Sequence, residues 1–219
     1  FDGDALARFA APASSELGWL VPWGSQAAGR FLAAAQRAGL FVQGADAVMT
    51  LDGRRFDRGT LVVRTADHGD HSAEDLHAIV TELALQTGAE VVATDTSYSE
   101  EGVSFGSSSV QPLPAPRIAL AWDQPTVSYS AGNTRFVLER QFGYPVEPVR
   151  VQHLASDELD RFDVVVLPDG AGSARVLGER GVQHLKDWVA RGGVLVAMSG
   201  GMRFAASDAV GLLPTDRER

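Results

Sequence analysis

The sequence predicts an α/β protein whose second half forms a parallel sheet. Three observations support this class. Hydrophobic residues make up 45% of the 219 residues, which is enough to bury a core. Apolar runs rich in β-branched residues alternate with segments of helical periodicity. The run "DVVVLPD" (163–169) is nearly continuously apolar, and such a strand needs cover on both faces of its sheet.

The first 96 residues predict a smaller α/β module. Each of its two expected helices repeats apolar residues at i, i+3, i+4 and i+7, and each is followed by a glycine that can end a helix. Ser25 and Ser72 precede these helices as N-caps. The expected elements are a strand at 18–23, a helix at 25–39, short strands within 40–65, a helix at 72–88 and a strand at 89–96.

Residues 97–116 have a different composition. This segment, "SYSEEGVSFGSSSVQPLPAP", is rich in serine, glycine and proline and shows little periodicity. Its three prolines favour a stiff, extended chain near its end. We therefore expect an interdomain linker at 97–116.

Residues 117–219 predict a flavodoxin-like sheet with helices on both faces, because strands and helices alternate as in right-handed βαβ units. No closing element follows the strand at 194–199, so the chain is expected to be a piece of a longer protein. The expected strands are 117–123, 146–151, 163–169 and 194–199, and the expected helices are 134–143, 156–162 and 179–193.

Composition excludes several classes of function. The formal net charge is −9, from 28 acidic and 19 basic residues, which disfavours a nucleic-acid surface. The chain has no cysteine, so disulfides, thiolate zinc sites and cysteine nucleophiles are excluded. No stretch approaches the roughly 18–20 apolar residues of a membrane span. The N-terminal residues also lack the form of a signal peptide.

Ser199 is a candidate nucleophile because the segment "VLVAMSGGMRFAA" (194–206) predicts a strand, a tight turn and a helix. A serine nucleophile needs a base, and no histidine follows Ser199 in the chain. His153 and His184 both precede it. We therefore favour a turn of small residues with positive φ over catalysis by Ser199.

His71 and Glu74 are the candidate metal ligands. They form a His-x-x-Glu pattern, and His184 is a distant third histidine, as in one class of zinc peptidase. Ser72 and Asp75, however, form a helix N-terminal cap that accounts for this acidic turn without a metal. We therefore expect no metal site in this chain.

Polar and aromatic residues gather where the strands of the second half end. In open parallel sheets this edge is the usual ligand site, although it can equally dock a neighbouring domain, which we favour. The turn "PDGAGSARVLG" (168–178) has Arg175 where a dinucleotide fingerprint needs its third glycine. The residues expected at this ligand or docking surface are Trp122, Asp123, Tyr129, Asn133, Arg135, Gly170 and Ser199.

Two resemblances follow from these residues. The stretches "DVVVLPDGAG" and "LKDWVARGGVLVAMSGGMRFAA" resemble the class I glutamine amidotransferase-like fold. In that family a cysteine stands where Ser199 stands here, a Pro-Gly-Gly turn forms the oxyanion site, and a histidine follows. This chain has Asp169 and Gly170 in the turn and neither the cysteine nor the later histidine. The resemblance therefore implies the fold without its activity.

The chain as a whole resembles the region that follows the peptidase domain in large bacterial zinc carboxypeptidases of the carboxypeptidase A type. The segments that carry this resemblance, which together span nearly all of 19–206, are "WLVPWGSQAAGRFLAAAQRAG", "GRRFDRGTLVVR", "GSSSVQPLPAPRIALAWD", "SAGNTRFVLERQFGYPV" and "FDVVVLPDGAGS".

This second resemblance implies a non-catalytic accessory region in a protein whose function is proteolysis. It implies that zinc, the catalytic residues and peptide-substrate binding belong to an upstream peptidase domain, which is the expected partner, and that the parent is exported. No cofactor is expected in the chain itself. A serine hydrolase using Ser199 and a small-molecule sensor remain as alternatives.

Overall fold

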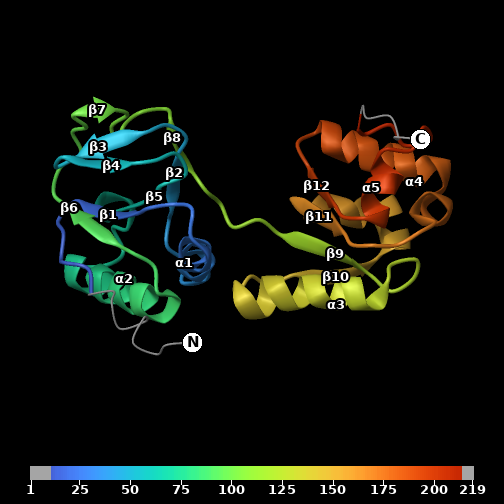
Figure 1. The fold of residues 1–219 in the computed structure, drawn as a ribbon, viewed down its shortest axis with the longest axis horizontal. Helices are drawn as coiled ribbons and strands as arrows, with labels where there is room; N and C mark the ends of the chain where they lie inside the picture. Colours follow the sequence, from blue (N-terminus) through green and yellow to red (C-terminus); the bar gives the residue numbers. More distant parts are fainter. Residues whose placement is uncertain (1–10, 214–219) are drawn as a thin grey trace. The chain divides into compact units, whose positions relative to one another are not determined.

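The computed structural model describes residues 11–213 and shows a mixed α/β protein with one parallel and two antiparallel sheets. The chain divides into two compact units, Phe1–Ala115 and Pro116–Arg219 (Figure 1). No helix among the described residues is long and apolar enough to cross a membrane.

The first unit is built on two antiparallel sheets. The five-stranded sheet has the order β6-β1-β5-β2-β8, and the three-stranded sheet has the order β4-β3-β7. The strands are β1 (Gly18–Val21), β2 (Gln43–Ala45), β3 (Met49–Leu51), β4 (Arg54–Phe56), β5 (Leu61–Arg64), β6 (Val92–Thr94), β7 (Glu101–Gly102) and β8 (Val110–Pro112).

Two helices, α1 (Gln26–Arg37) and α2 (Ala73–Thr87), cover one face of the five-stranded sheet, and the three-stranded sheet lies on the opposite side (Figure 1). Both expected serine caps are confirmed. The Ser25 side chain accepts from the Ala28 N–H at 3.0 Å, and the Ser72 side chain accepts from the Asp75 N–H at 3.1 Å. One core of apolar side chains, including Trp19 and Phe31, lies between the helices and the sheet.

The segment expected as a linker carries two strands of the first unit. Within 97–116, β7 pairs with β3 and β8 pairs with β2. The Leu113 N–H also donates to the Val42 carbonyl oxygen at 2.8 Å. The first unit accordingly extends to Ala115. Serine- and glycine-rich composition did not reveal these strands because their stability comes from pairing with distant residues.

The second unit is a four-stranded parallel sheet with the order β10-β9-β11-β12. Its strands are β9 (Ile118–Trp122), β10 (Glu147–Arg150), β11 (Val164–Leu167) and β12 (Val194–Ala197). Its helices are α3 (Ser128–Phe136) with a π-helical turn Val137–Gln141, the 3₁₀ helices Val151–Ala155 and Asp157–Arg161, α4 (Ser173–Ala190) and α5 (Gly200–Ala205).

Two helices of this unit begin earlier than their apolar periodicity predicts. The helix expected at 134–143 begins at Ser128, where serines and a glycine weaken the sequence signal. The helix expected at 179–193 begins at Ser173 and kinks at Gly178, whose φ is 65°. The short helical turn expected at 156–162 is a 3₁₀ helix.

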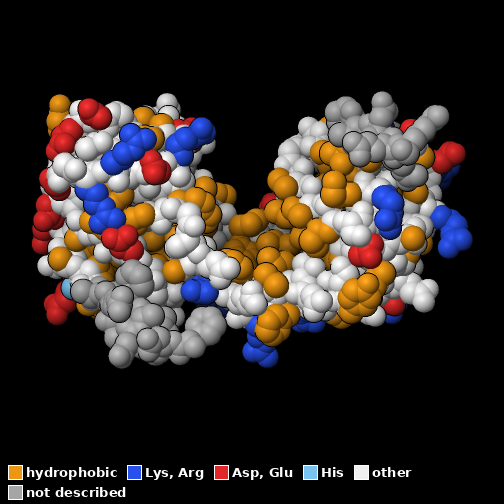
Figure 2. Space-filling model, viewed as in Figure 1, with side chains coloured by type: hydrophobic (Ala, Val, Ile, Leu, Met, Phe, Trp, Pro, Cys, Tyr) orange, Lys and Arg blue, Asp and Glu red, His pale blue; other side chains and the backbone are white. Residues whose placement is uncertain are grey.

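The sheet of the second unit is covered unequally. Figure 1 shows α4 and α5 on one side and α3 on the other. The α4 side buries the larger core, including Leu185 and Trp188. On the α3 side, Val194 and Val196 of β12 remain 51% and 42% exposed, and hydrophobic side chains are visible over the strands in Figure 2. The expected double cover is therefore incomplete at β12 within the described residues.

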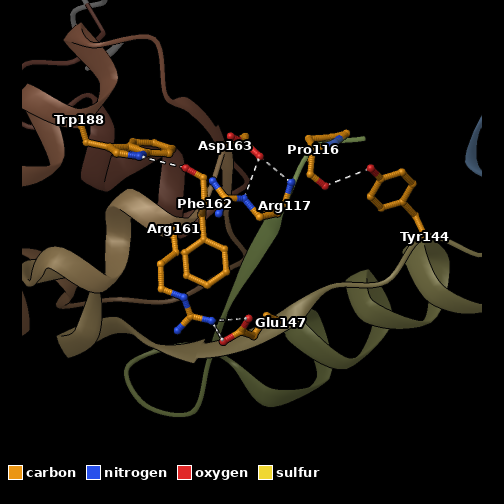
Figure 3. A network of polar contacts seen from close by, with 8 residues as sticks. All are labelled: Pro116, Arg117, Tyr144, Glu147, Arg161, Phe162, Asp163 and Trp188. Carbon is orange, nitrogen blue, oxygen red and sulfur yellow. Dashed lines mark hydrogen bonds and ion pairs between the residues drawn. The ribbon is translucent and has the colours of Figure 1, made fainter. Parts of the chain in front are cut away.

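A polar network closes the edge of the sheet where β9 and β11 begin (Figure 3). The Arg117 backbone N–H donates to the Asp163 carboxylate at 2.7 Å, and this bond is the main reason that the pKa of Asp163 lies below its usual value. A second contact joins this network, because the Tyr144 hydroxyl donates to the Pro116 carbonyl at 3.0 Å. Burial of the Tyr144 side chain is the main reason that its pKa is raised, and the negative charge of Asp163 raises it further. The Trp188 indole N–H donates to the Phe162 carbonyl at 3.2 Å.

Candidate functional site

The opposite edge of this sheet contains the elbow, which we define as Ser199, Gly200 and Gly201 between β12 and α5. Ser199 has φ 48° and ψ −109°, a conformation that non-glycine residues rarely adopt. Backbone strain of this kind is concentrated at functional sites and sharp turns. The sequence-predicted strand, turn and helix around Ser199 are confirmed.

The positive φ expected for this turn is found at Ser199, and the two glycines of the elbow serve close packing. A Cβ built on Gly200 would collide with the carbonyl oxygen of Gly170. A Cβ built on Gly201 would lie 2.5 Å from the carbonyl oxygen of Leu167. The elbow therefore needs glycine at these positions because the backbone that follows β11 lies against it.

Asp169, which follows β11, holds the elbow in place. Its carboxylate oxygen Oδ1 accepts hydrogen bonds from the Gly200 N–H at 2.9 Å and from the Ser199 hydroxyl at 3.0 Å. The Arg203 guanidinium is 3.8 Å from the same oxygen. The Gly200 bond first, and then the Ser199 bond, keep the pKa of Asp169 below its ordinary value.

Among the described residues, the Ser199 hydroxyl is paired with a carboxylate and has no hydrogen bond to a histidine. A carboxylate with a lowered pKa is a weak proton acceptor, so Asp169 orients the hydroxyl more readily than it deprotonates it. His153 is paired with Glu158 at 3.1 Å. His184 lies in α4, and its Nε2 is buried without a hydrogen-bond partner in the described part of the chain. The hydrogen bond that the Ser199 hydroxyl donates goes to Asp169.

A shallow pocket of about 230 Å³ lies beside the elbow. Its lining comes from the turn after β11, the first turn of α4 and the elbow helix α5. The residues that line it are Gly170, Ala171, Gly172, Ser173, Ala174, Gly200, Arg203, Phe204 and Ser207.

The strand order changes direction between β9 and β11, because β10 lies on one side of β9 and β11 on the other. Ligands of open α/β sheets bind at such a switch point. Here the backbone after β9 meets the turn after β11. Thr126 forms a bridge with Gly170, and the Val127 N–H donates to the Asp169 carbonyl at 2.8 Å. The Asp169 N–H donates to the Ser130 hydroxyl at 3.1 Å. The loops that follow β9 and β11 are thus hydrogen-bonded to each other at this edge.

The residues expected at the carboxyl edge form separate groups. Gly170 and Ser199 come together through Asp169, as described above. The Arg135 guanidinium lies over the Trp122 ring at 5.7 Å and pairs with Glu139 at 2.9 Å. Asp123 has φ 62° and pairs with Arg150 at 3.4 Å.

Tyr129 and Asn133 both lie on α3. Tyr129 is 71% exposed, and Asn133 is also exposed. The structure gives neither side chain a hydrogen-bond partner among the described residues. They are therefore available to a partner, although they do not converge with Ser199 in any recorded contact.

Among the described residues, the structure does not bring the candidate metal ligands His71 and Glu74 together with a third ligand. His71 and Glu74 are exposed, and within residues 11–213 no three His, Asp or Glu side chains could hold a metal ion. The neighbouring His68 is buried and its two ring nitrogens are occupied by the Phe41 N–H at 2.9 Å and the Arg64 carbonyl at 2.8 Å. His184 belongs to the second unit.

Arg203 was missed by sequence analysis, and Asp169 was noted in its turn but was not chosen as a site residue. The positions of both residues could have been inferred from the strand order and from helical spacing. Asp169 ends the strand next to β12, and the carboxyl ends of adjacent parallel strands meet at one edge. Arg203 follows Ser199 by one helical turn.

Comparison of the chain with protein-family models, with curated proteins and with solved structures gives no match.

Proposed function

We propose that this chain is a non-catalytic accessory region of a zinc metallocarboxypeptidase-like protein, and that its second unit has a flavodoxin-like, class I glutamine amidotransferase-like fold. The ordered resemblance of segments across 19–206 supports the first statement. The strand order β10-β9-β11-β12 supports the second. Counted within the unit this order is 2-1-3-4, which agrees with the flavodoxin-like order.

The observation that carries the non-catalytic role is the hydrogen bond from the Ser199 hydroxyl to the Asp169 carboxylate. The lowered pKa of Asp169 makes it a poor base, so the elbow keeps its shape while its hydroxyl is used for structure. The bridge between Thr126 and Gly170, which ties together the loops after β9 and β11, also supports a structural role for this edge. The carboxyl edge then serves to dock a neighbouring domain, with Tyr129 as an exposed anchor.

In this proposal proteolysis belongs to a peptidase domain upstream in the same polypeptide, and zinc belongs to that domain. The chain supplies no zinc ligand and does not touch the peptide bond. It packs against the peptidase domain or shapes access for peptide substrates. Export of the parent protein is part of the same proposal.

Treatment with a fluorophosphonate probe, which labels activated serines, tests the elbow. The expected result is no labelling of the purified chain beyond that of Ser199→Ala. Labelling of the wild-type chain that disappears in Ser199→Ala would instead support a serine hydrolase, the alternative that the φ of Ser199 and the neighbouring pocket favour.

A second experiment tests the accessory role. The coding sequence upstream of this region is expected to encode a peptidase domain with a His-x-x-Glu pattern and a distant histidine. That domain, expressed separately, should bind the 219-residue chain in a pull-down, and Tyr129→Ala should weaken the complex. Failure of the two to associate, or an upstream sequence of another kind, would contradict the proposal. A ligand-dependent rise in melting temperature without such a complex would favour a sensor.

A further inference from the structure

The first unit contains a larger pocket, of about 560 Å³, at the ends of β1, β2 and β5. This volume lies within the range of roughly 300–1,000 Å³ typical of small-molecule sites. Its lining is mostly apolar and comes from the loop after β1, the helix α1, the turn before β5 and the strand β8. The lining residues are Trp23, Leu32, Gly44, Ala45, Asp46, Arg58, Gly59, Leu61, Gln111 and Leu113.

Trp23 forms a preformed aromatic wall of this pocket. Its side chain remains 47% exposed, although indole rings are usually buried. Its ring lies against Gly59, where an added Cβ would be 2.7 Å from Cδ1 of the indole. Gly59 has φ 89°, so both the backbone conformation and the contact with the ring require glycine. The ring is thus fixed against the turn before β5 while part of it stays open to solvent.

Leu113, a second apolar lining residue, is also held in position. A Cβ on Gly44 would lie 2.9 Å from the Leu113 side chain, so the leucine packs directly on the β2 backbone. The Leu113 carbonyl accepts from the Gln36 side chain at 2.9 Å, and its N–H donates to Val42. An apolar group could bind between Trp23 and Leu113 without rearrangement of either side chain, which lowers the cost of binding.

One cation and one anion also line the pocket. Arg58 and Asp46 are both exposed. Neither forms an ion pair within the described part of the chain. An apolar cavity that also presents one free charge of each sign is complementary to a molecule with an apolar body, one carboxylate and one ammonium group.

We propose that this pocket binds a small zwitterion with an apolar side chain, with the apolar group between Trp23 and Leu113, the carboxylate at Arg58 and the ammonium group at Asp46. Two sources share this chemistry: a free apolar α-amino acid and a short apolar peptide with free termini. This binding function goes beyond the accessory role proposed above and does not depend on it.

Isothermal titration calorimetry with the full chain tests the proposal. The probes are L-leucine, L-phenylalanine, L-leucyl-L-leucine and glycine. The expected result is saturable binding of at least one apolar zwitterion and none of glycine, which lacks the side chain. Binding of leucine or phenylalanine identifies the free amino acid as the source, and binding of the dipeptide alone identifies the peptide.

The proposed positions of the carboxylate at Arg58 and of the ammonium group at Asp46 are tested by combining variants with ligands that lack one charge. Arg58→Gln and Asp46→Asn should each weaken binding of the zwitterion by about fivefold or more, because each removes one charged partner. N-acetyl-leucine, which lacks the ammonium group, should be sensitive to Arg58→Gln and insensitive to Asp46→Asn. Leucinamide, which lacks the carboxylate, should show the reverse pattern.

Matched control variants show whether a loss of binding comes from the pocket or from the removal of any charged or aromatic side chain. Arg37→Gln, Asp70→Asn and Tyr98→Ala alter exposed residues outside the pocket and should leave affinity unchanged. Trp23→Ala should weaken binding by about tenfold, and Trp23→Phe should retain most of it. The proposal is overturned if no apolar zwitterion binds, or if Trp23→Ala and Arg58→Gln bind as well as the wild type.

Discussion

The carboxylate of Asp169 is the hydrogen-bond partner of the Ser199 hydroxyl. It accepts two hydrogen bonds from the elbow, and one of them comes from a backbone N–H that no substitution of Ser199 removes. Because its pKa is lowered in the folded state, ionised Asp169 stabilises the elbow at pH values above the ordinary pKa of aspartate. That contribution is lost as the pH falls through the lowered value.

Ser199→Ala is therefore expected to raise the pKa of Asp169 only part of the way to its ordinary value. The Gly200 N–H bond, which contributes most to the lowering, remains in this variant. A carboxyl-carbon NMR titration of both proteins measures the change. An unchanged pKa in Ser199→Ala would show that the hydroxyl does not donate to Asp169 in solution.

His68 bridges two segments of the first unit. Its Nε2 accepts from the Phe41 N–H, so its Nδ1 carries the proton that is donated to the Arg64 carbonyl. The sequence offered His71 and Glu74 as candidate metal ligands and gave no indication of a structural role for His68. The structure instead uses the buried histidine to connect backbone segments and leaves His71 exposed.

His68→Ala is expected to lower the free energy of unfolding of the first unit by about 1–3 kcal/mol, because it removes a buried side chain and leaves two partly buried backbone groups without their hydrogen-bond partner. The matched variant His71→Ala alters an exposed ring nearby and should change this free energy by less than about 0.5 kcal/mol. Urea unfolding followed by circular dichroism compares the two. Equal effects of both variants would contradict the bridging role.

At the scale of elements, the sequence predicted best where apolar periodicity and capping agreed. Helices α1 and α2 carry an apolar stripe, a serine cap and a following glycine, and they lie close to where these signals place them. The strands β7 and β8 and the first turns of α3 and α4 carry no such combination. Their positions depend on pairing and packing with residues distant in the sequence, which local patterns do not record.

The elbow shows the same limit. Sequence predicted a strand, a turn and a helix around Ser199, and it expected small residues and positive φ in the turn. The structure shows that Gly200 and Gly201 are required because the backbone after β11 approaches them. That approach is a property of neighbouring strands, and a sequence motif within 194–206 cannot display it.

Gly200→Ala is expected to destabilise the second unit by about 2–3 kcal/mol, because its Cβ would overlap the Gly170 carbonyl oxygen. Gly132→Ala is the control. This glycine lies within α3 with open space around its missing Cβ, so alanine there should stabilise by about 0.5–1 kcal/mol. Thermal unfolding of both variants measures the difference. A neutral Gly200→Ala would mean that the elbow and the turn after β11 are not in contact.

For the whole molecule, the sequence predicted the α/β class, and its composition also indicated that the chain can bury a core. The candidate site was predicted in part: the sequence placed Ser199 at one turn and Asp169 at another, but their hydrogen bond could be expected only once β11 and β12 were known to be neighbours. The sequence likewise did not predict that one face of β12 is uncovered, with Val194 and Val196 exposed. An apolar run does not show how many faces of its strand are covered.

The two units have separate cores, since each cluster of buried apolar side chains lies entirely within one unit. Calorimetry of the full chain should therefore resolve two unfolding transitions. Phe31→Ala alters the core of the first unit and should cost it about 3–5 kcal/mol, whereas Leu185→Ala alters the core of the second and should cost about 2–5 kcal/mol. Each variant should lower the temperature of one transition and leave the other in place. If both variants shift a single common transition, the units unfold together, and the coupling between them must be included in any account of how the chain supports a neighbouring domain.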